Sequence, residues 1–140
     1  MRIVLDTSVL VAAARSRNGA SFQLVSMLPI ADFEIAVTVA LYTEWQAVLT
    51  RAEHLPPGAT VNEALAFVRY LASIAHQQDV YFLWRPLLRD PDDDMVVECA
   101  VASGSTMIVT HNVRDFAAAA SLNIRAVTPG DFLRMVGSKS

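Results

Sequence analysis

A chain of 140 residues is long enough for one domain with a single hydrophobic core. Apolar residues make up 54% of it, yet no apolar run approaches the roughly 20 residues of a membrane-spanning helix. Its one cysteine, Cys99, excludes an internal disulfide and a thiolate metal cage, and the net charge of −3 argues mildly against a nucleic-acid partner. The apolar excess favours a homodimer, and the early acid Asp6 interrupts any secretory signal, so we expect a cytoplasmic protein with no membrane attachment.

The first half of the chain predicts two buried strands, each followed by helical sequence. Residues 1–5 are an almost wholly apolar run that ends at Asp6, and residues 33–38 are a second run rich in β-branched side chains. The stretch around Gly19 has the composition of a turn. Helices are expected over residues 8–14, 20–27 and 40–51.

The second half continues this alternation. Thr60 and Glu63 have the capping-box spacing and predict the start of a helix that runs to about Gln77. Residues 80–84 fit either a short strand or an extended link. Further helices are expected over residues 95–103, 116–120 and 129–136, and further strands over residues 106–110 and 125–127. The pattern predicts an α/β fold with three layers, α/β/α, around a central parallel sheet of four or five strands, in a domain of residues 1–136 with a tail of residues 137–140.

Acidic residues follow the ends of apolar runs at four places along the chain, namely Asp6, Glu44, Asp94 and Asp115. Asp6 follows the first strand, and Asp115 lies just beyond the strand over residues 106–110. In an open α/β sheet the crevice at the carboxyl ends of the strands binds ligands, so we expect these acids to meet there. Carboxylates brought together repel one another and lose hydration, which predicts a divalent cation as their neutralising partner.

The acidic run at residues 92–94 has a structural alternative, because acids are favoured at the start of a helix. One acid is enough for that purpose, so at least one of the three is expected to have a further role. We assign that role to Asp94, because Glu98 lies one turn further on and is available as an auxiliary ligand. Glu98 as an ordinary solvated residue stays an alternative.

Polar residues beside these acids are candidates for holding the carboxylates or binding a phosphate oxygen. Asp6 alone would be an ordinary helix N-cap. Oxygen ligands suit Mg²⁺ or Mn²⁺, and the three histidines lack the spacing of a zinc site. The supporting residues are Thr7, Ser8, Asp93, Glu98, Thr110 and Asn112. Arg15, Arg17 and Arg114 lie near the same predicted edge, and arginine suits phosphate because its planar group can bond it bidentately.

Four segments occur in order along the chain: residues 3–9 (IVLDTSV), 42–45 (YTEW), 89–94 (RDPDDD) and 110–116 (THNVRDF). Together they resemble the PIN domain family, and within it the VapC-like toxins of bacterial type II toxin-antitoxin systems. The resemblance extends from residue 2 to about residue 134. It implies a Mg²⁺- or Mn²⁺-dependent endoribonuclease with RNA as substrate and a cognate antitoxin as partner. Arg15, Arg17 and Arg114 are then the candidates for contact with the RNA backbone. The acids that it assigns to catalysis and metal binding are Asp6, Glu44, Asp94 and one near Asp115.

The last site departs from the family pattern. Many relatives have an aspartate where this chain has Asn112, and Asp115 follows three residues later. Whether Asn112 or Asp115 fills the last site therefore stays open, as does the binding of a second metal. The alternative function is a PIN-like module that has lost cleavage and binds RNA or protein.

Overall fold

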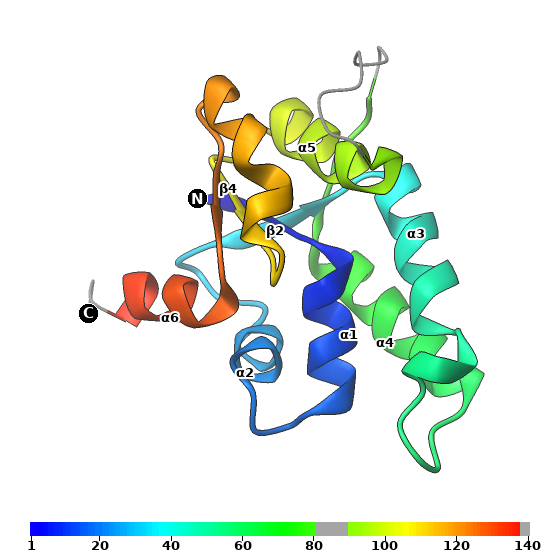
Figure 1. Ribbon diagram of the computed structural model, residues 1–140. Coiled ribbons are helices and arrows are strands. Elements are labelled where there is room, and N and C mark those ends of the chain that lie inside the picture. The colour runs from blue at the N-terminus through cyan, green and yellow to red at the C-terminus, as the bar shows by residue number, and fades with distance from the viewer. Residues whose placement is uncertain (81–89, 138–140) are drawn as a thin grey trace.

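The central sheet consists of five parallel strands in the order β3-β2-β1-β4-β5. It is seen in a computed structural model that describes residues 1–80 and 90–137 (Figure 1). β1 pairs with β2 on one side and β4 on the other, with Ile3 opposite Ile35 and Met107. The strand order reverses at β1, and this is where open α/β sheets bind ligands at their carboxyl edge. The strands are β1 (Arg2–Leu5), β2 (Glu34–Val37), β3 (His76–Gln77), β4 (Met107–Val109) and β5 (Arg125–Val127).

Helices cover both faces of the sheet. α5 packs against β1, β2 and β4, and α1 and α2 lie together on the opposite side (Figure 1). This arrangement confirms the predicted α/β/α fold. The helices are α1 (Thr7–Arg15), α2 (Ala20–Ser26), α3 (Val39–Leu49), α4 (Val61–Ile74), α5 (Pro91–Ser103) and α6 (Pro129–Gly137), with 3-10 segments η1 (Ala52–His54) and η2 (Val113–Leu122).

Local capping sets two helix boundaries as the sequence predicts. The backbone N–H of Glu63 donates to Thr60 Oγ1 at 3.1 Å, which starts α4. Gly104 ends α5 with a φ of 71°, a left-handed conformation that glycine adopts without strain.

Two predicted α-helix boundaries differ from the structure by three residues or more. α5 begins at Pro91 instead of residue 95, because Asp90 Oδ1 accepts the N–H of Asp92 at 2.9 Å and proline suits the first helical position. α4 ends at Ile74, three residues early, because the next residues pair with β2 as β3. Of the segment expected as a strand or link over residues 80–84, only Val80 lies within the described residues, and it belongs to no strand.

The expected helix over residues 116–120 lies inside the longer 3-10 segment η2.

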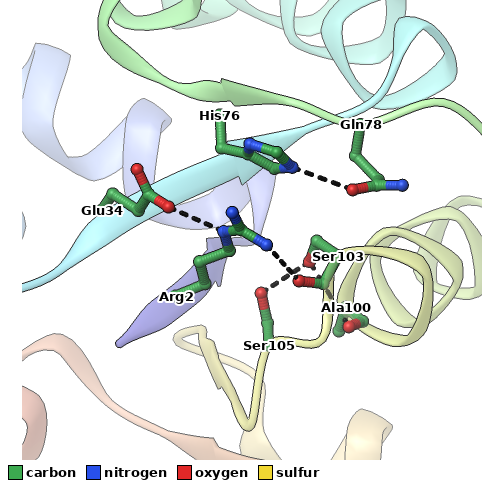
Figure 2. Close-up of polar contacts among 7 residues, drawn as sticks. All are labelled: Arg2, Glu34, His76, Gln78, Ala100, Ser103 and Ser105. Carbon is green, nitrogen blue, oxygen red and sulfur yellow. Dashed lines mark hydrogen bonds and ion pairs between the residues drawn. The ribbon is translucent and has the colours of Figure 1, made fainter.

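Arg2 ties the amino end of the central strand to α5 (Figure 2). Its Nε donates to Glu34 Oε1 at 2.7 Å on β2, and its Nη1 donates to the carbonyl oxygen of Ser103 at 3.0 Å. A cation is favourable at the carboxyl end of a helix. Arg2 therefore joins the carboxyl end of α5 to the amino end of β1, at the edge of the sheet away from the carboxyl ends of the strands.

The core lies on both faces of the sheet and includes the three apolar residues of β1 that precede Asp6. Phe33 and Phe132 meet edge to face with ring centroids 4.9 Å apart, which fixes α6 against the start of β2. Across residues 1–80 and 90–137, no helix combines the length and apolar character needed to cross a bilayer.

Candidate active site

Asp6 is held between the carboxyl ends of two neighbouring strands. It follows β1 directly and is only 6% exposed. It occupies the N-cap position of α1, but its carboxylate makes no capping hydrogen bond. Instead, Asp6 Oδ2 accepts from Ser8 Oγ and from Thr110 Oγ1, each at 2.7 Å. The carboxylate is therefore positioned by the two strand ends, and the simple N-cap alternative does not describe it.

The loop after β4 is fixed to α1 and α2 by further polar contacts. Thr110 Oγ1 accepts the backbone N–H of Asn112 at 2.9 Å, and Ser8 Oγ accepts the backbone N–H of His111 at 3.2 Å. The His111 ring Nε2 is hydrogen-bonded to Ser21 Oγ at 2.7 Å, and Ser21 is buried on α2. These bonds restrict the movement of Ser8 and Thr110, the residues that orient Asp6.

A cleft of about 760 Å³ opens beside Asp6. It is formed by α1, α3, the first turn of α5 and the loop after β4. Seven of the predicted site residues line it, namely Asp6, Thr7, Ser8, Arg15, Glu44, Asp93 and Asn112. The carboxylates along it are Asp6, Glu44, Asp90, Asp92 and Asp93, and the basic or imidazole side chains are Arg15, Arg51, His54 and His111.

The structure brings Asp93, rather than Asp94, to this cleft. Asp94 lies instead near Glu98: burial, followed by the charge of Asp94, raises the pKa of Glu98. Neither Asp94 nor Glu98 is among the residues that line the cleft.

Helical spacing explains why Asp93, and not Asp94, lines the cleft. Val96, Val97 and Ala100 follow Asp93 by three, four and seven residues, and all three are buried. Asp93 therefore shares the face of α5 that packs on the sheet. This apolar periodicity was present in the sequence and is the signal that indicates which acid of the run faces the sheet.

The carboxylates of the cleft act on one another electrostatically. Burial, followed by the charges of Asp6, Asp90, Asp115 and Asp92, raises the pKa of Asp93 from 3.8 to about 7.

On the α3 side, burial and the charges of Asp92, Asp90 and Asp6 raise the pKa of Glu44, against an opposing effect of Arg51. The carboxylates at the start of α5 therefore lie close enough to Glu44 on α3 for their charges to act on its pKa.

The donor chemistry of the cleft fits Mg²⁺ or Mn²⁺. Among the residues that the structure describes, no three His, Cys, Asp or Glu side chains converge closely enough to hold an ion by themselves. Mg²⁺ usually takes only one or two carboxylates and keeps several waters. Asp6, Glu44, Asp93 and Asn112 offer oxygen donors along the cleft, and a cation there would relieve the mutual repulsion that raises the pKa of Asp93.

The remaining predicted residues divide between the cleft and its surroundings. Asp115 is exposed in the first turn of η2 and does not line the cleft, although its charge contributes to the pKa of Asp93. Arg15 lines the cleft, whereas Arg17 and Arg114 line other surface pockets.

Sequence reasoning missed Arg51 and His54 at this site. In the predicted helix over residues 40–51, Arg51 follows Glu44 by seven residues, a spacing that places two side chains on one helix face. That spacing was a usable signal for Arg51. His54 lies beyond the helix, and we find no sequence signal for it.

Comparison with known proteins places the chain in a family. The chain resembles VapBC-1 from nontypeable Haemophilus influenzae (13% identity, TM-score 0.60, 93% of this chain and 99% of the other). It also resembles VapBC2 from Rickettsia felis bound to a promoter DNA fragment (14%, 0.64, 91% and 98%) and FitAB bound to the IR36 DNA fragment (17%, 0.59, 91% and 94%). No curated protein sequence matches it. The family model described as PIN domain matches residues 2–114, and the chain therefore belongs to the PIN domain family.

Proposed function

We propose that the protein is a divalent-metal-dependent endoribonuclease whose metal binds at Asp6, with Glu44 and Asp93 holding it directly or through metal-bound waters. PIN domains are in general nucleases, which supports this reaction class. The observation that carries the proposal is the Asp6 carboxylate, buried and doubly hydrogen-bonded at the switch point of the sheet, in a cleft shared with Glu44 and Asp93. We give Asp93 the role first assigned to Asp94 because Asp93 lines the cleft.

Each neighbouring residue has a defined task in this proposal. When bound, Mg²⁺ or Mn²⁺ supplies Lewis-acid activation of a water and neutralises charge on the phosphate. Ser8 and Thr110 hold Asp6 in the orientation that the ion needs. Glu44, with its raised pKa, accepts the proton of the attacking water.

The last site and the phosphate contacts are also part of the proposal. Asn112 lines the cleft, and Asp115 acts through its charge and through water. Thr7 and Arg15 are the proposed contacts to the RNA phosphates, because both line the cleft.

A nuclease assay tests the proposal. Purified protein should cut RNA with Mg²⁺ or Mn²⁺ and stop with EDTA, and Asp6→Asn should be folded and inactive. Asp93→Asn and Asp94→Asn form a matched pair, because each removes one acid from the first turn of α5. The first should lose about 10- to 100-fold more activity than the second, as expected for a lost metal contact. Equal losses would refute the choice of Asp93.

A second candidate function is supported by Asn112. An amide in place of a carboxylate removes one negative charge from the cleft, which weakens the hold on a cation. A PIN-like module that binds RNA or protein without cutting would then remain. RNA binding with no cleavage in either metal, unchanged in Asp6→Asn, would support this function over the nuclease.

We also propose an antitoxin partner and a homodimer. The structural neighbours VapBC and FitAB support the antitoxin, and the high apolar content supports self-association. Light scattering of the purified chain should give twice the monomer mass. Co-expression with the product of an adjacent small gene should yield a stable complex that suppresses cleavage, and a complex that leaves cleavage intact would argue against an antitoxin.

A further inference from the structure

The cleft has two chemically different ends. Asp6, Glu44 and Asp93 supply carboxylates at the carboxyl edge of the sheet, and Arg15, Arg51 and His54 supply basic groups further along the helices. α1 and α3 leave the sheet in the same direction and lie side by side, so their carboxyl ends point to the same end of the molecule (Figure 1). At about 1.5 Å per residue, the nine residues from Asp6 to Arg15 place their backbones about 14 Å apart.

The basic end is held in place by the fold. Arg15 Nη2 donates to the carbonyl oxygen of Glu53 at 2.6 Å, which joins the end of α1 to η1. The other donors of its planar guanidinium remain for a ligand.

Arg51 leaves its guanidinium for a ligand too. It forms neither a hydrogen bond nor an ion pair with any side chain within the described ranges, and its charge opposes the rise in the pKa of Glu44. It therefore stands close enough to influence the carboxylate end while keeping its own donors open.

His54 adds a ring N–H donor. Its Nδ1 is buried without a hydrogen-bond partner in the described part of the chain. A buried lone pair is less costly to leave unpaired than a buried N–H, so the proton belongs on Nε2. His54 borders the cleft together with both arginines, and the N–H on Nε2 suits a phosphate oxygen.

We propose that Arg15, Arg51 and His54 bind a second phosphate of the RNA strand, one or two nucleotides from the phosphate being cleaved. This inference rests on the proposed nuclease function and specifies its substrate: a single-stranded oligonucleotide that spans both ends of the cleft. Two arginines and an N–H donor match the oxygens of a phosphodiester, and arginine binds phosphate bidentately. The two ends of the cleft are separated along α1, so we assign the scissile phosphate to the carboxylates and the second phosphate to the arginines.

Salt dependence of RNA binding tests the proposal directly. Binding of a labelled single-stranded RNA is measured by fluorescence anisotropy, with Ca²⁺ in place of Mg²⁺ so that the RNA stays intact. Loss of one phosphate contact should reduce the slope of log affinity against log salt by about 0.7 for a single strand. Arg51→Gln should show that reduction, and Arg51→Lys should restore most of it.

Arg125→Gln is the matched control, because Arg125 is exposed at the amino end of β5 and does not line the cleft. Its slope should equal that of the unmodified protein. An equal slope for Arg51→Gln and Arg125→Gln overturns the proposal, and so does a lack of RNA binding by the unmodified protein.

Cleavage separates this proposal from the proposed function. The unmodified protein should cleave a substrate with a neutral methylphosphonate near the cut site less efficiently than the natural substrate, and the loss should appear in KM. On that modified substrate, Arg51→Gln and the unmodified protein should be equally efficient. A slope change at Arg51 without cleavage of any RNA would refute the nuclease and leave the second phosphate site standing. Cleavage that is insensitive to every methylphosphonate position would refute the site and leave the nuclease standing.

Discussion

Replacing Asp93 with asparagine should stabilise the metal-free protein at high pH. The pKa of Asp93 lies at about 7 in the folded protein and near 3.8 as an ordinary carboxyl. A raised folded pKa means that the proton favours the folded state, and this contribution is lost as the pH rises from 3.8 through 7. Above pH 7 the folded protein bears the full repulsion between Asp93 and its neighbours Asp6 and Asp90, and an amide at this position removes it.

The size of the effect follows from the same shift. Between pH 5 and pH 7 the folded protein keeps a proton on Asp93 that the unfolded chain has released, so the free energy of unfolding falls by at most about 1.36 kcal/mol per pH unit. Over these two units the ceiling is about 2.7 kcal/mol. Asp93 is only half-buried, so solvent screening reduces the expected gain to about 1 kcal/mol. For a domain of this size that corresponds to about 3 to 5 °C in Tm.

Thermal unfolding followed by circular dichroism measures this gain at pH 5 and pH 8, with EDTA or with Mg²⁺. In EDTA, Asp93→Asn should gain about 3 to 5 °C more over the unmodified protein at pH 8 than at pH 5. Mg²⁺ at ten times its Kd should stabilise the unmodified protein at pH 8 by about 1.4 kcal/mol and the variant by much less. Asp94→Asn serves as the control, because it removes the same charge from the same helix turn outside the cleft.

Two results would refute the reasoning. If Asp93→Asn differed from the unmodified protein by the same amount at pH 5 and pH 8, Asp93 would not carry a raised pKa. If Mg²⁺ stabilised the variant as much as the unmodified protein, Asp93 would not take part in holding the ion.

Three further predictions concern other parts of the molecule. Thr110→Val removes a donor to Asp6, so Mg²⁺ affinity measured by calorimetry should fall about 10- to 100-fold, and unchanged affinity would contradict the orienting role. Arg2→Gln should lower the free energy of unfolding in urea by about 0.5 to 1 kcal/mol, less at high salt, without altering RNA cleavage, because the pair with Glu34 is partly exposed and far from the cleft. Burial raises the pKa of Cys99 to about 12, so a thiol reagent at pH 8 should label the protein only as fast as it unfolds, and rapid labelling of the native protein would show that the thiol is accessible.

The sequence predicted the parts of the site that depend on strands. Asp6 and Thr110 each follow a buried apolar run, and parallel strands bring their carboxyl ends to one edge. The fold alone then places the two residues side by side, and the hydrogen bond between them follows. The strand β3 was not predictable in this way, because two residues carry no alternation and their strand character comes only from pairing with β2.

The parts that depend on helix rotation were harder to predict. Consecutive helical residues point about 100° apart, so a run of acids contains members that face the sheet and members that face away from it. The predicted start at residue 95 left Asp93 outside the helix, whereas the true start at Pro91 puts it in the first turn, in phase with Val96 and Val97. The helix start at Asp90 and the buried apolar face of α5 together place Asp93 at the cleft. A helix boundary that is wrong by one turn is enough to change which acid of the run is expected to face the cleft.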